Sequence, residues 1–461
     1  MTMAEDPSSG ESGIPAAYTY FGQFIDHDIT KTVFDPSLQP GPGLDPIQAP
    51  NILPIAKSRV FSLISNARTA PLDLDSVYLG GAIESIKPDG SFQLSEVSKA
   101  PFGRIPTATK LHDLPRRPMI VNPVGLEQQE LDRQAIIGDP RNDENLLVAQ
   151  LHLGFLRTHN ALMQRKLSAA DAQIALRRRY QWAVLHDFLP RICDKTVVAD
   201  VLKNGATVWQ VTKPEDLFIP LEFSVAAYRF GHSMIRGGYS HNATFSAAPF
   251  NLFFTFTALS GDQQPGPGPN FEFPTLPDNW PIEWHRFFGT AVLPASINPA
   301  RRIDANLTPE LGNLRDFQGI PIGNLMAKLA TRNLLRGYLL GLPTGQAVAN
   351  RLGVPRLPVA TLRNATPSGL TKVVEDAGLF DRTPLWFYIL AEAGDPAGAD
   401  GQHLGVVGSR IVAETLWNLA NHAQDSVIKT PPTAAELATN EFTLKGLIKI
   451  GQDPLMPPIE L

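Results

Sequence analysis

Apolar residues that recur at α-helical spacing constrain the fold of this chain most strongly. Two consecutive blocks, 144–167 and 170–192, carry such stripes, and the second ends at the helix breaker Pro190. The same pattern recurs in four further segments: 221–236, 322–341, 346–352 and 407–428. Strand-like alternation is scarce and short, and no repeat of fixed period is present. The sequence therefore predicts a mainly α fold.

Length and composition indicate how these helices are organised. The 461 residues are 43% hydrophobic and 18% charged, so the chain can bury a sizeable core. We expect a single domain over residues 1–461, or two closely fused lobes, with residues 1–14 flexible. The stretches 38–54 and 263–281 are rich in proline and glycine and are interpreted as surface loops.

Charge and cysteine content exclude several classes of protein. The net charge of −5 provides no long-range attraction for nucleic acid or an anionic membrane. Cys193 is the single cysteine, so neither an intrachain disulfide nor a cysteine-based metal cluster can form. No signal-peptide pattern and no apolar run of transmembrane length is present. We expect a cytoplasmic location if the N-terminus is complete, with secretion by a non-standard route as the alternative.

The run GQFIDHD at 22–28 is the first candidate site. If it is helical, Gln23, Asp26 and His27 share one face through i, i+3 and i, i+4 spacing. Asp28 then points about 100° away from His27. An imidazole can take and return a proton near neutral pH, which suits it to acid–base catalysis. A solvated polar turn capped by aspartates is the alternative.

An acidic turn follows at 69–78. Thr69, Asp73 and Asp75 stand at short alternate spacing and could supply hard oxygen ligands to Ca²⁺ together with backbone carbonyls. Taken alone, such a turn is more often a solvated loop.

The segment 138–163 begins with Gly-Asp-Pro-Arg and continues into a helical pattern. The guanidinium of Arg141 can stabilise negative charge that develops on an oxygen atom. Glu144 shares its face, and a carboxylate favoured by the helix dipole is one interpretation of it. We expect His152 and His159, further along this segment, to be core or interhelical histidines rather than metal ligands.

Two later segments, AAYRFGHSMI at 226–235 and LATRNLLRGYLLGLP at 329–343, complete a series in chain order. In this order the segments resemble the signatures of the animal haem peroxidase (peroxidase–cyclooxygenase) superfamily, whose distal helix carries Gln-x-x-Asp-His-Asp. The segment 404–417 resembles the closing helix of that family, so the likeness covers essentially the whole chain. The resemblance implies a helical fold that holds haem between core helices, in a bacterial-type member without disulfides.

On the distal side of the haem, the resemblance implies a role for each matching residue. His27 would be the acid–base, Arg141 its charged partner, and Gln23 a neighbour of the peroxide or halide. Asp26 and Glu144 would be able to form ester bonds to the haem.

On the proximal side, the resemblance implies that His232 binds the haem iron axially. Asn333 would accept the imidazole proton of His232 through its amide oxygen. Arg229 and Arg336 would meet the haem propionates.

The resemblance also turns the acidic turn into a calcium loop. Asp28 would ligate a structural Ca²⁺ together with Thr69, Asp73, Asp75 and the main-chain carbonyl of Pro71. The implied cofactors are therefore Ca²⁺ and haem, either as haem b or covalently ester-linked.

The activity implied is that of a haem peroxidase. It would reduce H₂O₂ through a ferryl intermediate and oxidise small phenolic or organic donors, halides or pseudohalides, as in a response to oxidative stress. One alternative is a fatty-acid dioxygenase resembling cyclooxygenase, but such members carry tyrosine three residues before the proximal histidine. Here Arg229 holds that position and Tyr228 precedes it. A non-catalytic haem- or calcium-binding scaffold is a second alternative, disfavoured because His27 and Arg141 are both present.

Overall fold

Helices dominate the part of the chain that the structure describes. The computed structural model describes residues 10–34, 53–99, 111–120, 124–254, 257, 273–289, 298–312, 314, 327–454 and 456–459. The mainly α fold predicted from the apolar spacing is confirmed. Its α-helices are α1 (Ala17–Ile29), α2 (Lys57–Leu63), α3 (Asp75–Tyr78), α4 (Gly125–Leu131), α5 (Leu146–Gln164), α6 (Ala169–Ala183), α7 (Leu189–Ile192), α8 (Lys195–Asn204), α9 (His285–Phe288), α10 (Leu329–Leu339), α11 (Gly345–Leu352), α12 (Val359–Asn364), α13 (Thr371–Asp376), α14 (Leu385–Ala393), α15 (Val406–Asn421), α16 (Ala434–Leu437) and α17 (Leu444–Ile450).

Short strands pair in four antiparallel ladders within the described ranges. The pairs are β1 (Glu11–Pro15) with β8 (Pro299–Arg301), β2 (Thr32–Phe34) with β3 (Ile64–Asn66), β4 (Ser95–Glu96) with β5 (His112–Asp113), and β6 (Gly238–Tyr239) with β7 (Ala248–Pro249). The flexibility expected of residues 1–14 stays a prediction. Residues 11–14 belong to a paired strand, while residues 1–9 lie outside the described part.

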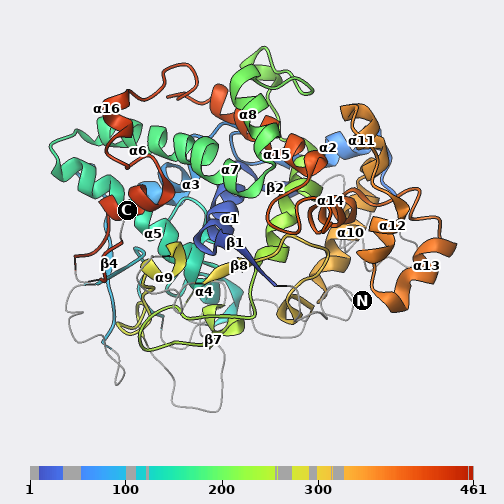
Figure 1. Cartoon of the computed structure of the whole chain (residues 1–461). Helices are drawn as coiled ribbons and strands as arrows, with labels where there is room; N and C mark the ends of the chain where they lie inside the picture. The colour runs from blue at the N-terminus through green and yellow to red at the C-terminus, as the bar shows by residue number, and fades with distance from the viewer. Residues whose placement is uncertain are drawn as a thin grey trace.

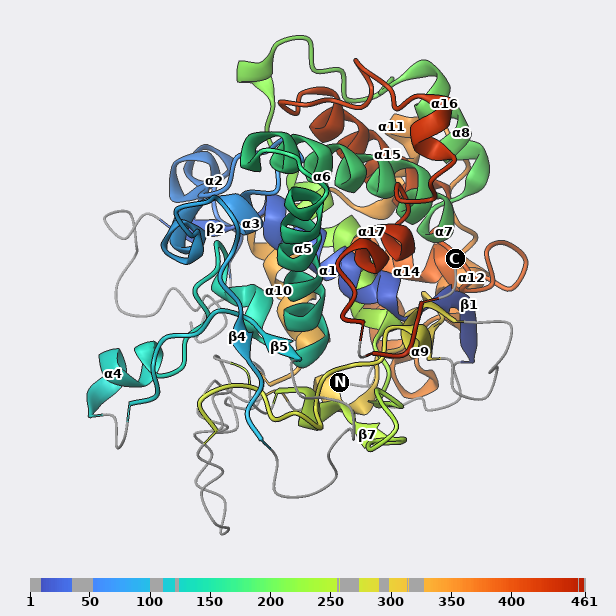
Figure 2. The same cartoon turned by 90° about the vertical axis from the view of Figure 1, so that its left-hand side faces the viewer.

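Helix α1 lies in the middle of the molecule, with α5 and α6 on one side and α10 and α14 on the other (Figure 1). Figure 2 shows α5 upright beside α1. The two helices are joined by Phe24 and Phe155, whose rings stack at a centroid distance of 4.4 Å. Tyr180 of α6 meets Phe24 edge-on at 6.1 Å and Phe155 at 5.9 Å. Such aromatic packing fixes α1 against α5 and α6.

The amino end of α5 is set by a local signal. The side chain of Asn145 accepts a hydrogen bond from the Val148 N–H at 3.1 Å and so caps the helix. The predicted helix at 144–167 is therefore confirmed with its start at Leu146. Because α5 is buried along most of its length, this cap determines where the residues just before it emerge beside α1.

Two predicted helices have irregular turns. The block 170–192 is α6, then the π-helix η4 (Val184–Phe188), then α7, which contains Pro190 in its first turn. Proline lacks an N–H and is tolerated there, so the chain stays helical through Pro190 rather than ending at it. The block 221–236 is the π-helix η6 (Glu222–Ala226) followed by the 3-10 helix η7 (Ala227–Met234).

The other helix predictions hold with shifted bounds. The segments 322–341, 346–352 and 407–428 correspond to α10, α11 and α15. The predicted loops lie largely outside the described residues, because 35–52 and 258–272 are not described.

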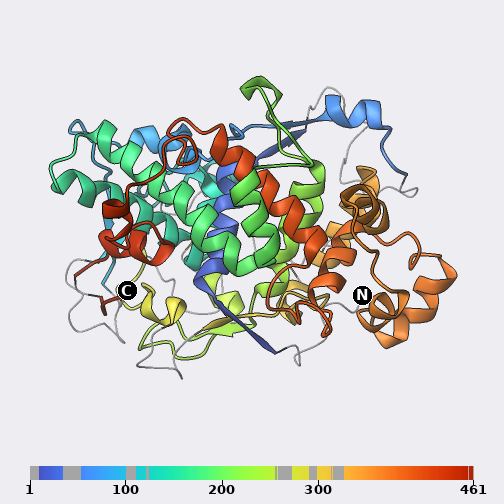
Figure 3. The same cartoon turned by 45° about the horizontal axis from the view of Figure 1, so that its top comes forward.

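Most buried apolar side chains of the described residues form one contiguous core that runs from Ile14 to Ile459, and Val60, Val225 and Leu340 form a small second cluster. The expectation of a single domain over residues 1–461 accords with this core and stays a prediction. Figure 3 shows α11, α12 and α13 (orange) gathered at one end of the molecule. None of the helices described here is long and apolar enough to cross a membrane.

Candidate active site

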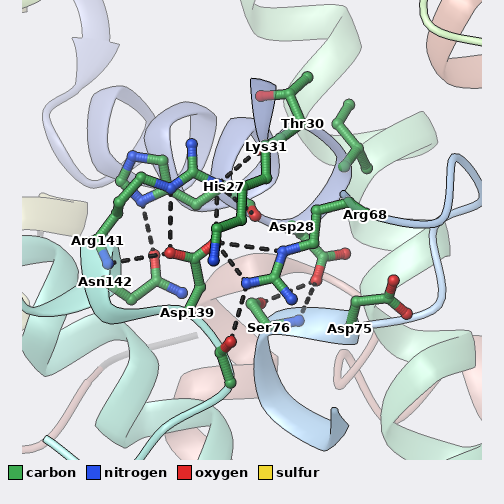
Figure 4. Close-up of polar contacts among 12 residues, drawn as sticks. His27, Asp28, Thr30, Lys31, Arg68, Asp75, Ser76, Asp139, Arg141 and Asn142 are labelled. Atoms are coloured by element: carbon green, nitrogen blue, oxygen red, sulfur yellow. Dashed lines mark hydrogen bonds and ion pairs between the residues drawn. The ribbon is translucent and has the colours of Figure 1, made fainter. Parts of the chain in front are cut away.

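The residues of the first motif, on α1, face two different parts of the structure, as their helical spacing predicts. His27 is buried, and its Nδ1 lies 2.9 Å from Oδ1 of Asn142. Asp28 is fully buried on another side, where its Oδ1 accepts hydrogen bonds from Ser76 N at 2.9 Å and Ser76 Oγ at 2.8 Å. Figure 4 shows the two neighbouring residues turned toward these different partners.

Arg141 lies beside His27 in the 3-10 helix η3 (Pro140–Asp143), where the sequence predicts a charged partner. Its Nε and Nη2 donate to the Asp139 carboxylate at 3.0 and 2.7 Å. Nη2 also donates to the carbonyl oxygens of His27 at 3.1 Å and Thr30 at 2.5 Å, and so holds the end of α1. Nη1 makes no hydrogen bond to any described residue, which leaves one edge of the guanidinium for a ligand.

Asp139 binds both Arg141 and Arg68, and sequence reasoning missed this residue. Burial by itself would raise its pKa, but hydrogen bonds and charge from Arg141 and Arg68 hold that pKa well below its ordinary value. Arg68 Nη2 donates to Asp139 Oδ2 at 2.5 Å and to the Gly138 carbonyl at 2.9 Å. Arg68 directly precedes the 69–78 loop, so its ion pair with the Asp139 carboxylate holds that loop against η3.

Gln23 and Glu144 lie together, as their predicted roles require. Gln23 Nε2 donates to Glu144 Oε1, and Asn145 Nδ2 donates to Gln23 Oε1 at 3.2 Å. Burial raises the pKa of Glu144, while the charges of His27 and Arg141 lower it. Glu144 is therefore held within electrostatic reach of the distal residues, and ester bonds from Glu144 and Asp26 to haem stay a prediction.

The proximal residues come together across α10 and η7. His232 Nδ1 lies 3.0 Å from the Asn333 side chain. The atom facing the ring is Nδ2, so the contact that we expected is present but the predicted amide oxygen is turned away. A half turn of the amide exchanges the two atoms. Burial, helped by Arg229, lowers the pKa of His232 to about 3, which keeps the imidazole neutral as iron ligation requires.

Two cations beside His232 show that the site fits a dianionic cofactor. Burial lowers the pKa of Arg229, and burial together with Arg229 lowers that of Arg336 to about 10. Nε of Arg229 is buried and has no hydrogen-bond partner among the described residues. Two guanidinium groups, one of them with a buried Nε that has no partner among the described residues, lie next to a neutral imidazole and suit the propionates and the iron of haem.

The predicted calcium residues are only partly assembled. Thr69 N and Oγ1 donate to Asp75 Oδ2 at 3.0 and 2.7 Å, and the Pro71 carbonyl accepts from Asp73 N at 2.9 Å. The Asp73 carboxylate is turned away, since its Oδ1 accepts from Gln424 N at 2.9 Å. No three acidic, histidine or cysteine side chains in the described ranges are arranged as a metal cage.

Asp28 nevertheless offers a carboxylate oxygen that a cation could bind. Its Oδ2 is buried without a described hydrogen-bond partner, and burial, with Asp75 adding to the effect, raises its pKa to about 7. A buried carboxylate oxygen beside a second carboxylate is a place where a hard cation would be stabilised. Calcium binding by Asp28, Thr69, Pro71, Asp73 and Asp75 stays a prediction that this observation supports.

Calcium should raise the resistance of the protein to heat. A ligand at 100 times its dissociation constant stabilises the folded state by about 2.7 kcal/mol. We expect CaCl₂ to raise the Tm after chelator treatment, and Asp28→Asn to abolish the response. The exposed Asp381→Asn serves as the matched control and should respond like the wild type. An equal response in Asp28→Asn would place the cation elsewhere.

The structure is a helical fold with a buried histidine on α1 and a neutral histidine on η7 beside two arginines. A profile of the animal haem peroxidase family matches residues 2–357. The chain therefore belongs to the animal haem peroxidase family.

Solved structures show the same fold. Peroxidase A from Dictyostelium discoideum aligns with a TM-score of 0.60 and 16% identity, covering 98% of this chain and 88% of that one. Fatty acid alpha-dioxygenase from Oryza sativa aligns with a TM-score of 0.55 and 13% identity, covering 97% and 74%. A peroxidase-like protein from Margaritifera margaritifera is 30% identical over 116 residues, which cover 22% of this chain and 14% of that protein.

Proposed function

We propose that this protein is a haem-dependent peroxidase that reduces H₂O₂ and oxidises small phenolic or organic donors, halides or pseudohalides. One observation supports this most directly. His27 is a buried imidazole whose Nδ1 faces an amide oxygen, so its Nε2 lone pair is free to accept a proton. Arg141 lies beside it with one guanidinium edge free. A role in removing peroxide during oxidative stress is part of the same proposal.

Each site residue has a separate role in the proposed reaction. Bound haem supplies an iron that passes oxidising equivalents from peroxide to a donor. His232 would hold that iron, with Asn333 orienting the imidazole and Arg229 and Arg336 receiving the propionates. His27 takes a proton from one peroxide oxygen and returns it to the other. Arg141 stabilises the negative charge on the departing oxygen, and Gln23 contacts an anionic donor.

Replacing His27 with alanine tests this proposal. A positioned general acid–base contributes roughly 10²–10⁴-fold to a rate, so the His27→Ala holoprotein should react with H₂O₂ at least about 100-fold more slowly. Stopped-flow spectroscopy of the haem absorption measures the rate. His186→Ala, at an exposed histidine, is the matched control and should react like the wild type.

Two results would contradict the proposal. Equal rates in His27→Ala and wild type would remove His27 from proton transfer. Absence of a Soret band after expression with added haem would instead leave a haem-free scaffold. Denaturing mass spectrometry of the same samples reports whether haem is covalently attached.

A fatty-acid dioxygenase is the second candidate, since the hydroxyl of Tyr228 is buried without a described hydrogen-bond partner. The ring of Tyr228 stacks on Phe223 at 4.5 Å, while Arg229 takes the position three residues before His232. In a 3-10 helix residues three apart share a face, so Arg229 rather than Tyr228 lies in line with His232. Oxygen uptake with linoleate, in the absence of peroxide, would favour this candidate over the peroxidase.

A further inference from the structure

Asn142 connects two buried histidines that come from different helices. Its Oδ1 lies 2.9 Å from Nδ1 of His27 on α1, and its Nδ2 lies 2.9 Å from Nδ1 of His152 on α5. Asn142 and His152 are fully buried, and His27 nearly so. Water therefore does not compete for these hydrogen bonds, and the orientation of the Asn142 amide in the structure sets the donor and acceptor of each.

The direction follows from what an amide can donate and accept. The amide oxygen only accepts, so the proton in the first contact belongs to Nδ1 of His27. The amide nitrogen only donates, so Nδ1 of His152 is the acceptor in the second contact. His27 then carries its single neutral-state proton on Nδ1, and the basic lone pair lies on Nε2.

His152 is held in a state that suits this arrangement. Its ring lies 5.8 Å from the ring of Phe24 on α1, and its Nε2 is buried without a hydrogen-bond partner among the described residues. Burial lowers the pKa of His152 to about 3, so the ring stays neutral, and the Asn142 Nδ2 that faces Nδ1 makes Nδ1 the acceptor.

We propose that Asn142 is a positioning residue that keeps the proton of His27 on Nδ1 and its basic lone pair on Nε2, and that His152 holds the Asn142 amide in the required orientation. This inference rests on the proposed function, because it assigns His27 the part of proton acceptor. It adds two residues to the site that lie outside its contacts with cofactor and substrate. Asn142 is next to Arg141, so η3 delivers both the charged group and the positioning group to His27 (Figure 4).

Cyanide binding to the holoprotein measures the positioning without requiring turnover. HCN must give up its proton to bind iron as the anion, so its association rate depends on a free Nε2 lone pair on His27. We expect Asn142→Leu to slow cyanide association, and the reaction with H₂O₂, by about 100-fold. Asn142→Asp keeps an acceptor opposite Nδ1 and adds negative charge. The cyanide and H₂O₂ rates of Asn142→Asp should therefore stay within about tenfold of wild type.

A second pair of variants tests His152 separately. In His152→Asn the side-chain oxygen takes the place of Nδ1 and can accept from Asn142, so cyanide association should stay near the wild-type rate. His152→Leu removes the acceptor and should slow it roughly 10–100-fold. His159→Leu is the matched control, because His159 is a buried histidine of the same helix bonded to Tyr78 and Gly90 instead.

Three outcomes of these measurements would overturn the proposal. Equal slowing of cyanide association in Asn142→Leu and Asn142→Asp would mean that Asn142 only supports the fold, and would overturn the proposal. So would wild-type rates in Asn142→Leu, or equal effects of His152→Leu and His159→Leu. A wild-type protein that binds cyanide with the predicted variant pattern yet does not react with H₂O₂ would refute the proposed function while supporting this inference.

Discussion

Replacing His232 with alanine should produce a folded protein that no longer retains haem. We propose the His232 imidazole as the iron ligand, and loss of an outer-shell partner alone weakens metal binding by roughly 10–100-fold. We therefore expect haem affinity to fall by at least about 100-fold, measured by titration of the Soret band. Asn333→Ala removes only the group that lies 3.0 Å from Nδ1, so its affinity should fall between that of His232→Ala and that of the wild type.

The controls separate ligation from folding. Added imidazole should restore a histidine-like spectrum to His232→Ala, because the cavity left by the side chain can accept the free ring. His422→Ala, at the end of α15, should bind haem like the wild type. An unchanged Soret band and unchanged affinity in His232→Ala would show that iron is bound elsewhere.

Replacing Gly138 with alanine should cause the largest loss of stability among single-methyl changes near the site. An added Cβ would lie 2.4 Å from the Ser76 carbonyl oxygen, 2.5 Å from that of Leu79 and 2.8 Å from that of Asp75. All three atoms belong to the backbone and cannot rotate away. Overpacking of this kind typically costs about 1–3 kcal/mol in the free energy of unfolding, and rigid backbone neighbours favour the upper end.

The position of Gly138 makes the result informative about function. It precedes Asp139, so the close approach brings the loop that carries Asp75 and Ser76 against η3, which carries Arg141. We expect Gly138→Ala to lower both the free energy of unfolding in urea and the calcium response of the Tm. Gly369→Ala is the control, since an added Cβ there meets nothing within 4 Å. A loss below about 0.5 kcal/mol would show that the loop can move away from η3.

The division of α1 into two faces could be predicted because it depends on local geometry. Residues at i, i+3 and i+4 share a face of any α-helix, so the sequence alone places Gln23, Asp26 and His27 on a different face from Asp28. The side chain of Asp28 does turn to a different partner, Ser76. For the same reason the helical blocks were recognisable, while the π-turn at 184–188 and the 3-10 geometry of η7 carry no comparable signal.

The sequence by itself determined the helical class, the order of the site segments and the residue types that each segment offers. Tertiary structure alone decided two contacts that no sequence pattern indicates: His27 with Asn142 across 115 residues, and Arg68 with Asp139 across 71. It also turned Asp73 toward Gln424 instead of toward Asp28. Helical periodicity is a property of neighbouring residues, whereas these pairings depend on how α1 and α5 pack around a shared core. For that reason no sequence pattern marks Asn142. Its importance comes from the two histidines that packing brings into contact with it.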